Sequence, residues 1–411
     1  MRRLLWLSCL SYLVIGLAHV VGGSVLEQMM THYQLSYKDS GQWVMNQFLG
    51  FLVGVLLAPY LTSKLGKRGC VLLAVGLLTV SEAAYSLLPP WGLMLAIAPL
   101  AGFGFGMTEA VIGAMVIDLS EEKATAMSRV EIFFGIGAFL MPTAAGFLIR
   151  HEIWQLSFPI VSAIAGITFI LWLTMSFGKI DEQIGYYARS SSLAASKPVA
   201  TDGKLSRLLG GYKPQTIPFV LLSAVFFMIY VGMEMSFANY LPSIMIEQAG
   251  VAAADAPAAL SLFWGTVIIG RLFAGGLSDR IGHSRYLLFA TGGASASLIL
   301  MALTGQASWM FVSIGLAGLF FSGIFGIALV YANGLVPGMT EKTTSLLVAF
   351  GGLGGALFPK LTGWVMDRYG VSQTILMIAF LIVLLFIVLL AMLTLGRKQQ
   401  ASLEIDTVGG N

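Results

Sequence analysis

Apolar runs of about 20 residues recur along the whole chain, and this feature restricts the possible folds more than any other. Such a run is long enough for a helix to cross the hydrocarbon core of a bilayer. The runs are too long for barrel strands and lack the alternating pattern of a transmembrane barrel. We therefore predict an all-α membrane protein with twelve transmembrane helices. The predicted spans lie near 5–29, 42–62, 69–88, 92–117, 127–149, 154–176, 217–243, 257–277, 285–303, 309–335, 343–365 and 373–396.

The composition agrees with a chain that is mostly embedded in lipid. Hydrophobic residues make up 57% of the sequence and charged residues only 10%, whereas about a quarter of the residues of a soluble protein are charged. The net charge of +3 gives no reason to expect a nucleic-acid partner. The two cysteines, Cys9 and Cys70, are far apart in sequence and suit neither a disulfide framework nor a metal site. We expect no metal and no cofactor other than a coupling ion.

Basic residues indicate the orientation of the predicted helices. Eighteen of the 23 Lys and Arg residues fall on one set of loops and ends, and only Lys38, Arg150 and Arg368 fall on the opposite set. Cytoplasmic loops carry such an excess, so we predict that both termini are cytoplasmic, in a plasma or inner membrane. The start of the chain resembles a signal peptide, but the apolar run is too long and no cleavage site follows. We interpret it as an uncleaved first helix.

The two halves of the sequence contain a repeat. The segment "IGAFLMPTAAGFLI" (136–149) aligns with "LGGALFPKLTGWVM" (353–366), so that Pro142 coincides with Pro359 and a glycine with a glycine. The segment "SKLGKRG" (63–69) aligns with "DRIGHSR" (279–285), so that Lys64 coincides with Arg280. The two alignments have almost the same spacing along the chain, which indicates an internal duplication.

The duplication predicts the domain organisation. We expect two pseudo-symmetric six-helix bundles, at residues 1–176 and 217–396. The polar segment 177–216 between them, rich in Ser and Ala, is predicted to be a cytoplasmic linker, and residues 397–411 a cytoplasmic tail.

Parallel six-helix repeats around a central path are the plan of major facilitator transporters, and the chain resembles that superfamily over essentially its whole length. The loop after the second helix of each half carries the resemblance. It is nearly intact as "GGLSDRIGHSR" in the second half and degraded to "PYLTSKLGKRG" in the first, where Pro59 and Ser63 replace a glycine and an aspartate. The resemblance implies alternating access around a central site and a cytoplasmic latch that closes in one state only. The latch residues it implies are Gly275, Asp279, Arg280, Gly282, Lys64, Gly66 and Arg271.

Few charged residues fall within the predicted spans, and each is a candidate for function. A charge at that depth costs several kcal/mol on insertion scales, so it should face a cavity or a partner. Glu109, in "GFGFGMTEAVIGAMV", is the first candidate for a proton site, and a structural acid that pairs with a neighbouring helix is the alternative. Glu234 is a further candidate for proton coupling. His19 is another, because histidine titrates near physiological pH. The charged residues that we place in the spans are Glu27, Glu109, Glu131, Glu234, Arg271 and Lys360.

The seventh predicted helix offers a wall of polar groups for a ligand. Glu234, Asn239 and Tyr240 lie within two helical turns and suit a polar, uncharged ligand such as a sugar, or else they hold helices together. Lys360 could neutralise Glu234 or bind an anionic substrate, and Arg271 could reach the inner surface or pair with Asp279. Further substrate-binding candidates are Asn46, Gln47, Glu131, Trp264, Tyr331 and Asn333.

Local motifs resemble one branch of the superfamily. "MTEAV" around Glu109, "YVGME" around Glu234 and "WGTVIIGRLFAG" around Arg271 are similar to the fucose permease and sodium-dependent glucose transporter branch. The first-helix aspartate of fucose permease has no counterpart in "HVVGGSV", and the Asn-Pro that follows its fourth-helix acid is also missing. The resemblance implies a monomeric carrier of a sugar or similar small polar solute, coupled to protons or, as an alternative, to sodium.

Two other functions remain open at this point. A proton-driven exporter of drugs or metabolites is the main alternative, although such antiporters usually carry an arginine in the fourth helix and this sequence does not. A membrane sensor is a minor alternative, because no large soluble domain could transmit a signal. The sequence contains no HExxH or GxSxG motif, so we expect no enzymatic activity.

Overall fold

The computed structural model describes residues 2–120, 123–178, 180–185, 212–336 and 339–408, and within these ranges the regular structure is helical. The prediction of an all-α membrane protein is confirmed, and eleven helices in the described ranges are long and apolar enough to span a membrane. The long helices of the N-terminal half are α1 (Arg2–Ser24), α3 (Tyr37–Ser86), α4 (Trp91–Leu119), α5 (Lys123–Arg150) and α6 (Ser157–Thr174). Those of the C-terminal half are α10 (Ile217–Ala249), α11 (Pro257–Ile281), α12 (His283–Leu303), α15 (Thr340–Tyr369) and α16 (Val371–Val408), and α13 (Ala307–Phe321) with α14 (Ile324–Gly334) forms one further spanning segment. Shorter elements are α2 (Leu26–Tyr33), the 3-10 turn η1 (Trp154–Leu156) and α7 (Ile180–Ile184).

Helix α3 accounts for the difference between eleven long helices and twelve predicted spans. It contains 50 residues and is interrupted at Gly66, whose φ of 74° and ψ of 165° are not helical. Gly282, with φ 89° and ψ 142°, separates α11 from α12 at the repeat-related position. Glycine reaches positive φ without the steric cost that other residues incur. The chain therefore turns at the same place in both halves, and α3 supplies two spanning segments.

Two predicted spans contain a break, and one helix is longer than predicted. The span near 5–29 divides at Val25 into α1 and α2, and the span near 309–335 divides into α13 and α14 around Gly323. Helix α16 continues to Val408, beyond the predicted start of the tail at residue 397. Most of the predicted linker, residues 186–211, lies outside the described residues.

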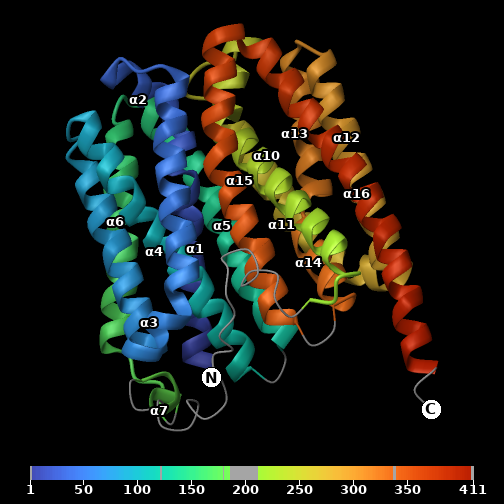
Figure 1. The fold of residues 1–411 in the computed structure, drawn as a ribbon. Coiled ribbons are helices and arrows are strands. Elements are labelled where there is room, and N and C mark those ends of the chain that lie inside the picture. The colour runs from blue at the N-terminus through green and yellow to red at the C-terminus, as the bar shows by residue number, and fades with distance from the viewer. Residues whose placement is uncertain (1, 121–122, 179, 186–211, 337–338, 409–411) are drawn as a thin grey trace.

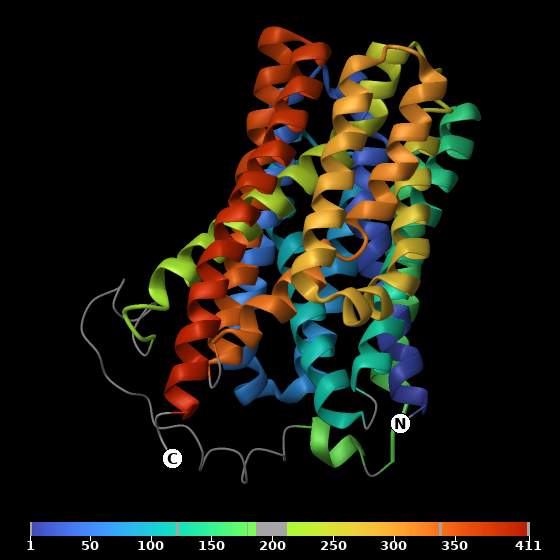
Figure 2. The ribbon, with the colours of Figure 1, turned by 90° about the vertical axis from the view of Figure 1, so that its right-hand side faces the viewer.

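The helices form two sets that lie side by side in Figure 1. The N-terminal set, from α1 to α6, is blue to green, and the C-terminal set, from α10 to α16, is yellow-green to red. The sets meet mainly where α3 packs on α15, α5 on α11 and α1 on α10. Figures 1 and 2 place both chain ends at the end of the molecule that also carries α7. We name this the basic end and the opposite one, where α2 lies, the distal end.

Glycines set the close approach of neighbouring helices. A Cβ atom on Gly102 of α4 would lie 1.8 Å from the carbonyl oxygen of Gln47, and one on Gly50 of α3 would lie 2.0 Å from that of Pro99. No larger side chain fits at either position. This contact fixes the position of α3, and with it Asn46 and Gln47, against α4.

At the basic end, one arginine anchors the end of α6. Arg68 donates to the carbonyl oxygens of Trp172 and Met175, each at 2.8 Å, and to the carboxylate of Asp181 at 3.1 Å. The last carbonyl groups of a helix lack intrahelical donors, and a guanidinium group satisfies them well.

Candidate coupling and substrate site

An ion pair joins the two sets of helices, and its charges act on two further carboxyl groups. Arg271 of α11 donates through Nη1 to Glu131 of α5, at 3.1 Å to Oε2 and 3.2 Å to the backbone oxygen. The Arg271 and Glu131 side chains are 25% and 36% exposed, so the pair is only partly buried. The charges of Arg271 and Glu131 also act on Glu109 of α4 and on Glu234 of α10. The guanidinium group of Arg271 therefore binds one carboxylate, Glu131, and its charge also acts on two further carboxyl groups.

Two buried tyrosines hold the helices that carry these acids. Tyr12 of α1 donates to the backbone oxygen of Glu109 at 3.1 Å. The Tyr230 hydroxyl lies 3.0 Å from Oε1 of Glu234 and 3.3 Å from the carbonyl oxygen of Phe321, the last residue of α13. Tyr230 thus connects Glu234 to the break between α13 and α14.

His19 lies where α1 meets α10, in an aromatic environment. Its Nε2 atom is 2.8 Å from the sulfur of Met235, the residue that follows Glu234. The rings of Phe48, Phe105 and Phe134 surround it edge-on, with centroids 5.6 to 5.8 Å away. His19 and Met235 have the same spacing along the chain as the second pair of repeat segments. The contact therefore joins repeat-related positions of the two sets.

Trp264 of α11 is a buried donor without an acceptor. Its side chain is 2% exposed, and its Nε1 atom has no hydrogen-bond partner among the described residues. The indole ring packs edge-on against Phe134 at 5.7 Å and Phe263 at 5.4 Å between centroids. Because Phe134 also contacts His19, Trp264 lies close to the contact between the two sets of helices. A buried donor without a partner costs about 1–3 kcal/mol, so its retention needs an explanation.

The predicted polar wall on α10 makes contacts within the protein. The side-chain nitrogen of Asn239 donates to the carbonyl oxygen of Met235 at 2.9 Å, within its own helix. The Tyr240 hydroxyl lies 3.0 Å from the carbonyl oxygens of both Tyr37 and Pro359. The Tyr240 contacts correspond to the alternative considered for this residue, in which it holds helices together, whereas the Asn239 contact joins no second helix.

Lys360 has a different partner from the two that the sequence suggested. Its ammonium group donates to Gln42 of α3, whose side-chain nitrogen donates to Asn46 at 2.7 Å. Asn46 in turn donates to the carbonyl oxygen of Leu95 at 3.0 Å. A polar chain therefore runs from α15 across α3 to α4, and Gln42, which the sequence analysis did not single out, is its central member.

The remaining candidates lie towards the two ends of the molecule. Glu27 of α2, at the distal end, accepts a hydrogen bond from the Tyr37 hydroxyl at 2.9 Å. Towards the basic end, the side-chain nitrogen of Asn333 donates to Thr344 at 2.8 Å, while its side-chain amide oxygen has no partner in the described chain. None of these contacts joins the cluster around Arg271.

The suggested pair of Arg271 with Asp279 is wrong for this state. Arg271 pairs with Glu131. Asp279 instead lies 3.8 Å from Nε2 of His283. The arginine therefore belongs to the contact between the two sets of helices and not to the loop at the basic end.

The latch residues at the basic end lie apart from close neighbours. At Gly275, Gly276 and Gly282, no atom of the described chain outside the local backbone lies within 4 Å of an added Cβ position. Lys64, in the first half, lies over the ring of Tyr60 at 4.4 Å. The resemblance implies close packing at the latch, but these glycines make no close contact with another helix of the described chain.

Sequence reasoning missed one membrane acid. Glu82, on the second segment of α3, is 1% exposed, and neither carboxyl oxygen has a partner among the described residues. The signal was present, because "TVSEAAYSLL" places a carboxyl group inside the predicted span 69–88.

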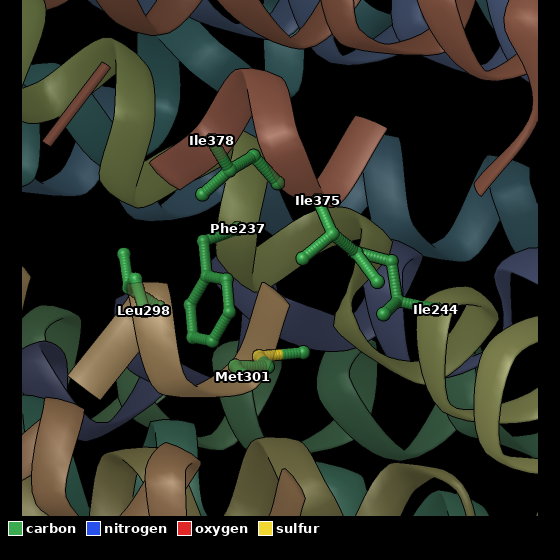
Figure 3. A pocket seen from close by; sticks show the side chains of 6 residues that line it. All are labelled: Phe237, Ile244, Leu298, Met301, Ile375 and Ile378. Carbon is green, nitrogen blue, oxygen red and sulfur yellow. The ribbon is translucent and has the colours of Figure 1, made fainter. Parts of the chain in front are cut away.

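A small apolar gap lies within the C-terminal set and is unrelated to these groups. Figure 3 shows side chains from α10, α12 and α16 that line it, and all six are hydrophobic. They are Phe237, Ile244, Leu298, Met301, Ile375 and Ile378. This gap offers a polar solute no hydrogen bonds.

Comparison with known proteins agrees with this architecture. The family model described as Major Facilitator Superfamily matches residues 8–359 and, in a second match, residues 222–406. The chain belongs to this superfamily of membrane carriers, so it is a multi-pass transporter of small solutes and not an enzyme.

Individual relatives are more specific. The chain is 30% identical to the glucose/mannose transporter GlcP of Bacillus subtilis over 358 residues, which cover 87% of this chain and 86% of that protein. A solved structure of the nucleoside transporter NupG matches with a TM-score of 0.75 at 15% identity, over 95% of this chain and 98% of that one. The D-xylose-proton symporter matches with a TM-score of 0.74 at 12% identity, over 94% and 96%. The two structural matches support the fold alone.

Proposed function

We propose that this protein carries a sugar or a similar polar, uncharged solute across the cell membrane by alternating access, coupled to protons. The similarity to a glucose/mannose transporter over most of both chains supports the substrate class. The excess of Lys and Arg at one end supports a cytoplasmic location for that end and for both termini. We further propose that one chain is the transporting unit.

The carboxyl groups that share Arg271 are the observation that carries the coupling. With one cation among Glu109, Glu131 and Glu234, the cluster has a net negative charge unless it takes up protons. A charge within the membrane costs several kcal/mol, so a change in the access of water to the cluster favours a change in the number of protons that the cluster binds. The cluster joins helices of both sets, and a change in its charge therefore acts on the contact between them.

Trp264 supports sugar binding. A sugar ring presents apolar C–H faces that pack on aromatic rings and hydroxyl groups that accept hydrogen bonds. Trp264 offers an aromatic ring beside Phe134 and an indole N–H with no partner in the described chain. In this proposal a solute hydroxyl is the missing acceptor.

Glu109→Gln tests the coupling. The variant should lose accumulation of glucose or mannose driven by an imposed proton gradient in proteoliposomes, while exchange of labelled for unlabelled sugar at equal pH continues. Glu82→Gln is the matched control, because it neutralises another buried carboxyl group in the same set of helices and should leave accumulation intact. Unchanged accumulation in Glu109→Gln would remove this residue from the coupling mechanism.

Trp264→Phe tests the substrate site. It keeps an aromatic ring but removes the N–H, so sugar affinity should fall about two- to tenfold, the value of one neutral hydrogen bond. Trp43→Phe is the control, because the Trp43 indole already donates to the Tyr85 hydroxyl at 3.2 Å and should matter for stability alone. Binding of cationic dyes and no sugar by the unmodified protein would instead favour the exporter.

A further inference from the structure

At the distal end, a carboxylate from one set of helices caps a helix of the other. Asp367 of α15 accepts hydrogen bonds from the backbone N–H groups of Tyr37, at 2.9 Å to Oδ1, and Lys38, at 2.8 Å to Oδ2. These are the first two residues of α3. The first N–H groups of a helix have no intrahelical acceptor, and negative charge is favourable there. The contact therefore connects the two sets through charge-assisted hydrogen bonds.

A second contact connects the sets at the equivalent place on the other side. Arg150, the last residue of α5, donates through Nη2 to Asp255, two residues before the start of α11. The alignment that superimposes the prolines of α5 and α15 also places Arg150 on Asp367 and Lys38 on Asp255. The two contacts thus use repeat-related positions: Asp367 binds backbone N–H groups at the start of α3, whereas Arg150, of opposite charge, binds the Asp255 carboxylate before α11.

The backbone beneath the two contacts repeats as well. A Cβ atom on Gly146 of α5 would lie 2.7 Å from the carbonyl oxygen of Ala254, and one on Gly363 of α15 would lie 2.2 Å from that of Tyr37. The same alignment places Gly146 on Gly363 and Tyr37 on Ala254. The close approach of a helix to the start of a partner helix therefore occurs twice.

We propose that these contacts are twin clasps of an outer gate, which keep the carrier closed at the distal end and must both open before a solute enters from that side. The first clasp is Asp367 with the amides of Tyr37 and Lys38, and the second is Arg150 with Asp255. This inference goes beyond the proposed substrate and coupling and is independent of both. Arg150 and Asp255 are 64% and 56% exposed, so the second clasp is weak and readily reversible.

The gate is tested by measuring the distance between the two sets of helices at the distal end. Spin labels at Gly92→Cys and Gln306→Cys report this distance by pulsed electron resonance in lipid nanodiscs. The native Cys9 and Cys70 are 5% and 0% exposed, so the introduced cysteines are the ones labelled. All measurements use the full chain without added substrate, so their outcome is separate from that of the transport assays.

Asp367→Asn should raise the ratio of the long-distance to the short-distance population about two- to tenfold, the effect of losing a helix-capping carboxylate. Asp39→Asn is the matched control. Asp39 caps the same helix, but it pairs with Ser36 of its own set, at 2.9 Å between Oδ2 and the hydroxyl. An equal shift in both variants, or none in Asp367→Asn, would overturn the first clasp.

Charge exchange tests the second clasp. Arg150→Asp and Asp255→Arg should each raise the open population about two- to fivefold, as expected for an exposed ion pair. The double variant, with both substitutions, should return it to the original value. A double variant that stays as open as the singles would show that the pair does not hold the gate.

Discussion

Replacement of Glu82 by leucine should stabilise the protein. The side chain is 1% exposed, and both carboxyl oxygens lack a hydrogen-bond partner in the described chain. Even a neutral polar group buried without a partner costs about 1–3 kcal/mol by mutational data. Leucine is of similar size and has no polar atom, so the free energy of unfolding should rise by about that amount. For a cooperative unit the size of one half, this corresponds to about 2–4 °C in Tm per kcal/mol.

Thermal unfolding of the detergent-purified protein, followed by tryptophan fluorescence, measures the change. Glu82→Gln is the control, because it retains the shape and an unsatisfied amide and should leave Tm nearly unchanged. Sugar exchange in proteoliposomes should be normal in both variants. A Tm that falls in Glu82→Leu, or exchange that stops, would refute this reasoning, because it would mean that Glu82 binds a proton, an ion or a solute during transport.

Three further predictions concern charge, packing and pH. Arg271→Gln leaves Glu131 without its ion-pair partner and removes a positive charge that acts on Glu109 and Glu234, so it should lower Tm and abolish transport. Arg271→Lys should retain part of both, and equal loss in the two variants would argue against a role of charge. Gly102→Ala should prevent normal folding, because its Cβ atom would lie 1.8 Å from the Gln47 carbonyl oxygen. Gly92→Ala is the control, because no atom of the described chain outside the local backbone lies within 4 Å of its Cβ position. Size-exclusion chromatography should show a folded, monodisperse protein for Gly92→Ala and not for Gly102→Ala. The hydrogen bond from Ser176 holds the pKa of Asp181 below its ordinary value, with help from the Phe177 amide and the Arg68 charge. Asp181 therefore stabilises the end of α6 fully at pH values above its pKa in the unfolded chain, and this stabilisation is lost as pH falls through the lowered pKa of the folded protein. Amide hydrogen exchange of residues 174–178 should therefore accelerate on acidification of the native protein. In Asp181→Asn the exchange should depend less on pH.

The membrane helices and the repeat were predictable because both are recorded locally in the sequence. Hydropathy marks each span, and the repeated loop motif contains Gly66 and Gly282, at which the chain turns with positive φ in each half. The breaks within α1–α2 and α13–α14 were not predicted, because the hydropathy of those segments is continuous across them.

The partners of the polar groups could not be read from the sequence, because they depend on how helices rotate against one another. Lys360 binds Gln42 of the other set of helices, and Arg271 binds Glu131 rather than Asp279, which is nearer in sequence. For Trp264 and Glu82, the feature that the sequence could not show is the absence of a hydrogen-bond partner in the described chain. Their lack of partners becomes visible only once every neighbouring atom is placed.

The hydroxyl of Tyr230 has one proton and two neighbouring acceptors, which compete for it. While Glu234 receives that proton, the Phe321 carbonyl, at the interruption of the tenth span, has no share in it. In the mechanism we propose, a solute or proton that binds Glu234 in place of this hydrogen bond would free the Tyr230 hydroxyl to donate to Phe321. Loading of the carrier would then change the contact that Tyr230 makes at the break between α13 and α14.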